Sequence, residues 1–168
     1  MLNALQKSAI VPVISLLILL PACRDEVICT EDVVSRAGAG FYVRDGEEKR
    51  DTVLNNLTFY GVLRPDSLLY DSSGGIRQIV FPLSRGEGEY TGFVLMLGSL
   101  SDTLRIHHSS RLELVSFSCG FTVIHDIEGV SFGNTIIDTI SISDPLVDLT
   151  DDENLEIYIR PAVVDSVG

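Results

Sequence analysis

Short runs of alternating or β-branched residues recur along most of this chain, and nearly every run ends at a turn signal. At residues 103–108, for example, Leu104 and Ile106 alternate with polar residues, which is the pattern of a strand with one buried face. Helical periodicity is almost absent. The pattern predicts strands at residues 40–44, 57–63, 78–83, 91–97, 103–108, 112–117, 120–126, 136–143 and 155–160.

The connections carry turn chemistry, as in Arg44-Asp45-Gly46, because aspartate and glycine reach turn conformations at low cost. Many short strands at such spacing predict an all-β fold, a single antiparallel β-sandwich or barrel-like domain. We assign residues 35–168 to this domain and expect the tail after Pro161 to be loose. At residues 136–142, alternation places Asp138 on one face with isoleucines, so we expect this acid at the rim or hydrogen-bonded inside.

The first 22 residues have the composition of a signal peptide. Lys7 is their only charged residue, and an apolar run follows from Ala9 to Leu20. This run fits the hydrophobic region of a signal peptide and is shorter than the roughly 20 residues of a membrane-spanning helix. We therefore expect residues 1–22 to be a lipoprotein signal peptide.

Cys23 ends a stretch, Leu20-Pro21-Ala22-Cys23, that resembles the bacterial lipobox. The resemblance implies acylation of Cys23, cleavage of the chain before it, and a lipidated tether over residues 23–34. Two or three acyl chains give stable anchoring, since each buried CH₂ contributes about 0.8 kcal/mol. The alternatives are an uncleaved anchor, or an ordinary signal peptide followed by a cysteine that is there by chance.

The chain is acidic, with 24 Asp and Glu residues against 12 Lys and Arg residues and a formal net charge of −12. Such a charge repels nucleic acid and anionic headgroups, so we expect no nucleic-acid partner and membrane attachment through the lipid alone. The expected location is the cell envelope, anchored to the outer membrane and facing the periplasm or the cell surface. Arg24-Asp25-Glu26 resembles the surface-export signal of Bacteroidota lipoproteins, and a solvated tether is the alternative.

Cys29 and Cys119 are the two cysteines that remain once Cys23 is assigned to the anchor. An even number of cysteines in an oxidising compartment favours a disulfide between them. The alternative is that Cys119 is a nucleophile.

A serine hydrolase signature is present only in outline. Residues 129–133 match G-x-S-x-G around Ser131, but a nucleophile elbow requires a helix and a histidine after the serine. A β-branched strand follows instead, and His125 is the last histidine. We expect a β-turn at this position and no catalytic residue.

Metal-binding patterns are equally weak. His107 and His108 are neighbours in a predicted strand, so they point to opposite faces and cannot easily chelate one ion together. We expect His107 at the surface and His108 partly buried with a hydrogen-bond partner. The acidic run at residues 148–154 lacks the glycine-centred spacing of a calcium loop. We expect no metal and no cofactor.

An Asp residue followed by Ser or Thr and an apolar residue recurs at residues 51–53, 66–68, 102–104, 138–140 and 165–167. The pattern resembles the O-glycosylation motif of Bacteroidota envelope proteins, which implies Ser67 and Ser166 as candidate O-glycosylation sites. The alternative is a conformational preference, because these dipeptides leave turns and enter strands readily.

Four segments, at residues 59–71, 102–108, 118–121 and 154–159, together resemble an uncharacterised family of Bacteroidota lipoproteins known only as a domain of unknown function. The resemblance covers nearly the whole chain after residue 22. It implies a signal peptide, a lipidated cysteine, a paired-cysteine β-domain and an envelope location, and it supplies no catalytic residue.

The favoured function is that of a non-enzymatic envelope lipoprotein acting as a binding or assembly module, with an envelope protein or glycan as partner. The alternative is a β-barrel carrier of a lipid or small hydrophobic ligand. A third interpretation, a hydrolase using Ser131 or Cys119, requires a histidine within hydrogen-bond reach. A cavity of several hundred Å³ favours the carrier, and a filled core favours the module.

Overall fold

The computed structural model describes Cys29 and residues 33–46, 48–86, 88 and 90–167. The predicted signal peptide, Cys23 and most of the tether lie outside these residues. The chain divides into a first unit, Met1–Thr30, and a second unit, Glu31–Gly168; every strand that the structure describes lies in the second unit.

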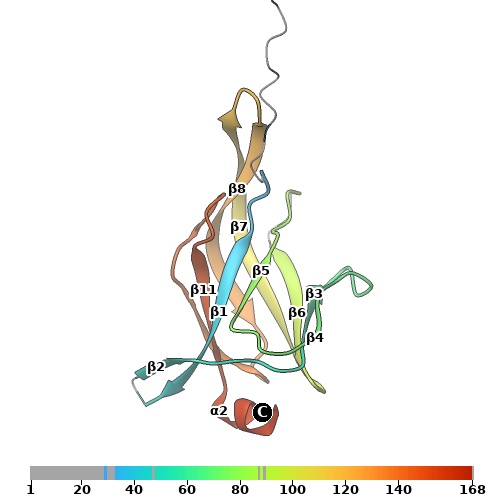
Figure 1. The fold of residues 1–168 in the computed structure, drawn as a ribbon, viewed down its shortest axis with the longest axis vertical. Helices are drawn as coiled ribbons and strands as arrows, with labels where there is room; N and C mark the ends of the chain where they lie inside the picture. The colour runs from blue at the N-terminus through green and yellow to red at the C-terminus, as the bar shows by residue number, and fades with distance from the viewer. Residues whose placement is uncertain (1–28, 30–32, 47, 87, 89, 168) are drawn as a thin grey trace, which may run out of the picture. The chain divides into compact units, whose positions relative to one another are not determined.

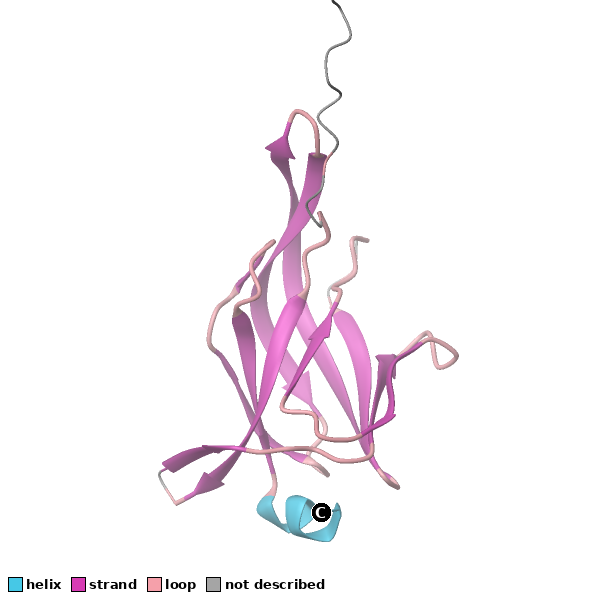
Figure 2. Ribbon diagram, in the orientation of Figure 1, coloured by secondary structure: helices cyan, strands magenta, loops and turns pink. Residues whose placement is uncertain are grey.

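Two curled, mostly antiparallel sheets form a half-barrel, which confirms the all-β prediction (Figures 1 and 2). In the described residues, the first sheet consists of β1 (Ala37–Asp45), β2 (Glu48–Asp51), β5 (Gln78–Phe81), β9 (Ile137–Ile142) and β11 (Glu153–Ile159). The second consists of β3 (Leu57–Gly61), β4 (Leu68–Ser73), β6 (Thr91–Leu97), β7 (Leu100–Ser116), β8 (Gly120–Phe132) and β10 (Leu146–Val147).

The first strand and the last strand are hydrogen-bonded to each other in parallel, with Phe41 opposite Ile157. On its other edge, β1 pairs with β5 through residues 37–40 and with β2 through residues 42–45. Both edges of β1 are therefore occupied, and its alternate residues Ala37, Ala39 and Phe41 are buried. The alternation that predicts a strand here reflects one face that is packed against the second sheet.

An aromatic cluster joins the two sheets. Phe81 of β5 lies with its ring centroid 4.8 Å from that of Phe93 on β6 and 5.3 Å from that of Phe59 on β3. Phe59 and Phe93 are stacked at 4.9 Å. These three rings and fully buried aliphatic side chains such as Leu95 and Leu104 fill the space between the sheets, as in other well-packed interiors.

β7 and β8 form one long hairpin that extends beyond the other strands (Figure 1). The strands predicted at 103–108 and 112–117 are thus one continuous strand. The β-turn predicted around Ser131 is wrong, because Ser131 is an exposed residue of β8 paired with Arg105. The geometry that a nucleophile elbow requires, a strand followed by a sharp turn and a helix, is also not found at this position.

Two local predictions near the end of the chain need correction. The strand predicted from residue 136 begins at Ile137. Asp138 is exposed, at a bulge where the register with β11 shifts, so it does not share a buried face with the isoleucines. The tail expected to be loose contains helix α2 (Pro161–Val167). Its first residue, Pro161, suits the first position of a helix because its fixed φ is already helical. Within the described residues, no helix has the length and apolar character needed to cross a membrane.

Candidate functional site

The largest hollow that we describe is an apolar groove of about 600 Å³ on the second sheet. It lies between the β3–β4 turn, the segment after β5 and the start of β6. We call it the apolar groove. Its apolar lining consists of Val62, Leu63, Leu69, Pro82, Leu83, Tyr90 and Phe93.

The turn between β3 and β4 shapes one wall of this groove. Within it, the N–H of Arg64 donates to the carbonyl of Gly61 at 2.8 Å, and the N–H of Ser67 donates to the carbonyl of Arg64 at 3.0 Å. The N–H of Val62 donates to the carbonyl of Gly92 on β6 at 2.9 Å. These bonds hold Leu63 in the solvent, with 93% of its surface exposed. A cluster of exposed apolar side chains beside a groove marks an interaction site more often than a bare surface does.

Thr91 connects the apolar groove to a histidine–serine cluster at the base of the long hairpin. Its hydroxyl accepts a hydrogen bond from the N–H of Ser84 at 2.9 Å and lies 2.7 Å from Nε2 of His108. The hydroxyl of Ser110 lies 3.3 Å from Nδ1 of His108 and 2.8 Å from Nδ1 of His125. The two imidazole rings meet edge to face, with centroids 4.9 Å apart.

One arrangement of protons satisfies all of these contacts. Thr91 donates to Nε2 of His108, Nδ1–H of His108 donates to Ser110, and Ser110 donates to Nδ1 of His125. In this arrangement of hydrogen bonds both imidazoles are neutral.

Burial is the main reason that both histidines stay neutral. It lowers the pKa of His125 to about 4, with further lowering from His108 and Arg85, and Asp126 opposes the shift. Burial also lowers the pKa of His108. At neutral pH the cluster therefore carries no charge at the base of the hairpin.

The hydroxyl of Ser110 lies as close to His125 as a nucleophile lies to its general base, but His125 is too weak a base for that role. A pKa of about 4 makes the imidazole of His125 a weak base at neutral pH. In the described part of the chain, neither imidazole is hydrogen-bonded to a carboxylate that could orient it and raise its pKa. The geometry instead suits a structural role, in which these hydrogen bonds fix the hairpin to the start of β6 beside the groove.

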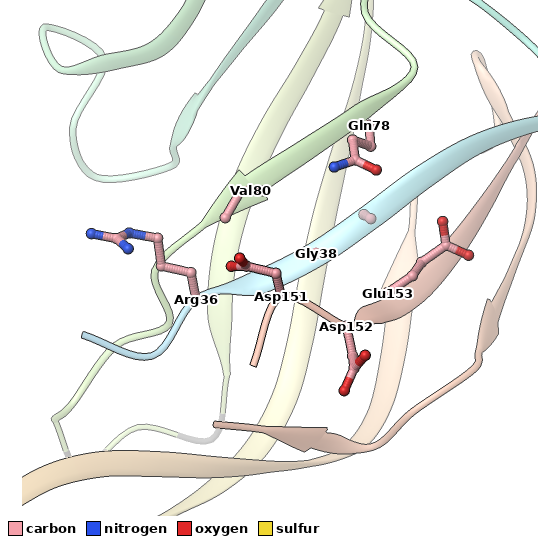
Figure 3. A pocket seen from close by; sticks show the side chains of 8 residues that line it. Arg36, Gly38, Gln78, Val80, Asp151, Asp152 and Glu153 are labelled. Carbon is pink, nitrogen blue, oxygen red and sulfur yellow. The ribbon is translucent and has the colours of Figure 1, made fainter. Parts of the chain in front are cut away.

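A second hollow of about 270 Å³ is polar and acidic, and Figure 3 shows it where β1 passes between β5 and the start of β11. Arg36, Asp151, Asp152 and Glu153 contribute its charged side chains. Tyr42 donates to both carboxylate oxygens of Glu153, at 3.0 and 2.8 Å. Burial and then this contact raise the pKa of Tyr42 to about 12. No cluster with the makings of a metal site is found among the residues that the structure describes.

The structure places the sequence-predicted residues as follows. Cys29 and Cys119 are disulfide-bonded, which confirms that prediction. His108 is buried with hydrogen-bond partners, as predicted. His107 was predicted at the surface and is half-buried, with its ring centroid 5.6 Å from that of Tyr90. Ser67 is exposed at the groove, and Ser166 lies in α2.

Sequence reasoning missed the groove and the role of Ser110. The signal for the groove was the adjacent pair Val62-Leu63 directly before a turn, where apolar residues are not needed for the strand. Ser110 gave no signal, because its distance from His125 is set by the pairing of two strands.

The fold and its site define a two-sheet, all-β domain with an apolar surface groove. The chain belongs to DUF6452, a family of unknown function whose model matches residues 56–159. No curated protein and no solved structure matches the chain. The matched residues run from the start of β3 to the end of β11, so the groove and the histidine–serine cluster both lie within the family's segment.

Proposed function

We propose that this protein is a lipid-anchored, non-enzymatic module of a Bacteroidota cell envelope that binds an apolar segment of a partner protein in the apolar groove. The observation that carries the proposal is the groove itself, about 600 Å³ in volume with Leu63 almost fully exposed at its edge. Exposed apolar side chains cost free energy in water, and a bound apolar segment removes that cost.

The anchor rests on the lipobox-like sequence that ends at Cys23. The disulfide at Cys29 and Cys119 supports an oxidising compartment, as expected for an envelope protein. The resemblance to Bacteroidota lipoproteins supports the same location. Because the domain is acidic overall, acyl chains and not headgroup charge would hold it at the membrane.

A small hydrophobic ligand is the second candidate, and it would occupy the same groove. The volume lies within the range of roughly 300–1,000 Å³ that is common for small-molecule sites. A carrier with an enclosed interior is less well supported, because the rings of Phe59, Phe81 and Phe93 occupy the space between the sheets.

Site-specific crosslinking in cells tests the groove. A photoreactive amino acid at position 63 should form a covalent adduct with a discrete envelope protein, and the same residue at position 53 should not, because Val53 is exposed away from the groove. Leu69→Ser in the same chain should reduce the adduct. Equal adducts from both positions would contradict the proposal.

A binding assay separates the two candidates. Binding of the dye N-phenyl-1-naphthylamine by the purified protein, lost in Leu69→Ser, together with no protein adduct at position 63, would replace the partner segment with a small ligand. Absence of both the adduct and the dye binding would overturn the groove as the functional site.

The anchor has its own test. Globomycin should block maturation of the chain, and the N-terminal peptide of the mature protein should carry acyl mass on Cys23. Proteinase K added to intact cells then reports the face: digestion indicates surface display, and complete protection beside a digested surface protein indicates the periplasm.

A further inference from the structure

The end of the long hairpin exposes large apolar side chains that the fold leaves uncovered. We call residues 112–123, from β7 through the connecting turn into β8, the hairpin tip. Leu112 is 71% exposed, Leu114 47% and Phe121 65%, and Phe117 in the turn is fully exposed. Isolated exposed apolar residues are ordinary, but four at the end of one hairpin form a patch.

The strand register places most of these side chains on one face. Leu112 lies opposite Val123, and Leu114 lies opposite Phe121, so these two pairs of side chains project from the same side of the hairpin, and Phe117 lies in the turn beyond them. This is the side that carries Leu104 and Ile106 inside the body of the domain. The hairpin therefore extends the core-facing surface past the point where the first sheet covers it (Figure 2).

The hairpin tip also carries little charge, because Glu113, an exposed residue at its margin, is its one charged residue. Residues 114–124 contain no Asp, Glu, Lys or Arg in a chain with a net charge of −12. At its base, Arg111 is paired with Asp126 across the strands. An apolar end with one charged residue at its margin, on an otherwise acidic protein, has the chemistry of a surface that enters the boundary between lipid headgroups and acyl chains.

The disulfide sets where this tip must be. Cys119 lies in the turn between β7 and β8 and is bonded to Cys29. Cys23 precedes Cys29 by six residues, and six residues span at most about 20 Å when fully extended. A disulfide adds roughly 6 Å between its Cα atoms, so a lipid on Cys23 would keep Cys119 within about 26 Å of the bilayer that holds the acyl chains.

We propose that the hairpin tip inserts into the interface of that bilayer, with Phe117 and Phe121 as its deepest side chains. The inference rests on the proposed lipidation of Cys23 and is independent of what occupies the apolar groove. Insertion would give the domain a second membrane contact beside the anchor and would fix its orientation, with the acidic body held away from the headgroups. Loss of one buried phenylalanine should lower partition into neutral vesicles roughly tenfold or more.

The chain has no tryptophan, so a single one introduced at the tip is a specific reporter. The full-length protein carrying Phe117→Trp is reconstituted into phosphatidylcholine vesicles, with and without brominated acyl chains. The matched control carries Val53→Trp, which replaces an exposed apolar side chain outside both the apolar groove and the hairpin tip. In Phe117→Trp we expect a blue-shifted emission and quenching by the brominated lipid. Emission in the control should be quenched far less.

Burial of the hairpin tip by something other than the bilayer gives a different result. A blue shift that depends on protein concentration and shows no lipid quenching would indicate a second copy of the chain and overturn the inference. Emission of a fully hydrated tryptophan in the vesicles would overturn it as well.

Mass spectrometry of the same sample separates this inference from the anchor on which it rests. Acyl mass on Cys23 with unquenched Phe117→Trp rejects the tip contact and leaves the anchor standing. Quenching without acyl mass supports the tip contact and rejects the anchor.

Discussion

Asp102 on β7 accepts a hydrogen bond of 2.7 Å from the backbone N–H of Ile136, just before β9 begins. The same carboxylate accepts from the N–H groups of Ile137 at 2.9 Å and Thr135 at 3.0 Å. Asp102 is buried. One side chain of the second sheet thus satisfies three backbone donors at the start of a strand of the first sheet, which fixes where the two sheets meet.

Replacing that carboxylate should therefore be costly. Asp102→Ala leaves three N–H groups without their acceptor and should lower the free energy of unfolding by about 2–4 kcal/mol. Asp138→Ala, which removes an exposed acid from β9, is the matched control and should change it by less than about 0.5 kcal/mol. Urea denaturation followed by circular dichroism measures both, and equal effects would contradict the role given to Asp102.

Acid should destabilise the domain through its buried histidines. The pKa of His125 is about 4 in the folded protein and about 6.5 when unfolded, so the unfolded chain binds the proton more tightly between these values. Stability should be full above pH 6.5 and fall as the pH drops towards 4, by about 1–2 kcal/mol at pH 5.

A comparison of variants checks the source of that pH dependence. His125→Gln should flatten the stability profile between pH 4 and pH 6.5, and His107→Gln, on the opposite face of the hairpin, should leave it unchanged. NMR titration of the His125 ring gives the pKa directly, and a value near 6.5 would contradict this account.

Loss of the disulfide should weaken the domain without abolishing its sheets. The bridge closes a loop of about ninety residues, for which loop entropy assigns roughly 4–5 kcal/mol as an upper figure. Cys29→Ser and Cys119→Ser should each lower the melting temperature, and the double variant should match the single ones. The far-ultraviolet signal of the β-sheets should persist at 25 °C. Two free thiols in the native protein, measured by mass spectrometry, would be the contrary result.

Gly38 should not tolerate a side chain. A Cβ atom at this position would lie 2.8 Å from the backbone carbonyl oxygen of Asp152, where β1 approaches β11. Gly38→Ala should cost about 1–3 kcal/mol because backbone must move to relieve the contact. Gly129→Ala on β8 is the control, since nothing lies within 4 Å of its Cβ position. A cost no greater than that of the control would show that the strands have room to separate.

The sequence predicted the strands that alternate and missed the ones that do not. β2 consists of four exposed residues, Glu48–Asp51, and exists because β1 offers it a hydrogen-bonding edge. A break was expected between 108 and 112 because Ser109, Ser110 and Arg111 are polar, yet they pair with β8 like their neighbours. These residues are polar because the strand leaves the protein core here and enters solvent, and not because the chain turns.

Relations between distant segments were beyond the reach of pattern reasoning. Alternation gives the faces of a strand but not the direction of its partner, so the parallel pairing of β1 and β11 carried no local signal. The contact of Ser110 with His125 depends on a bulge at His107 and His108 that resets the register of the hairpin. The disulfide was predictable because counting cysteines requires no geometry.

The parallel pairing of β1 with β11 determines when the first sheet can finish folding. The N–H of Gly38 finds its acceptor on Asn154, 116 residues later, so β1 leaves the ribosome long before the strand that secures it exists. Until β11 arrives, the apolar residues of β1 and β5 form an unfinished sheet with an open edge, which other chains can join. We therefore expect chains truncated before residue 153 to depend on chaperones and to aggregate, although they retain the whole β6–β7–β8 meander.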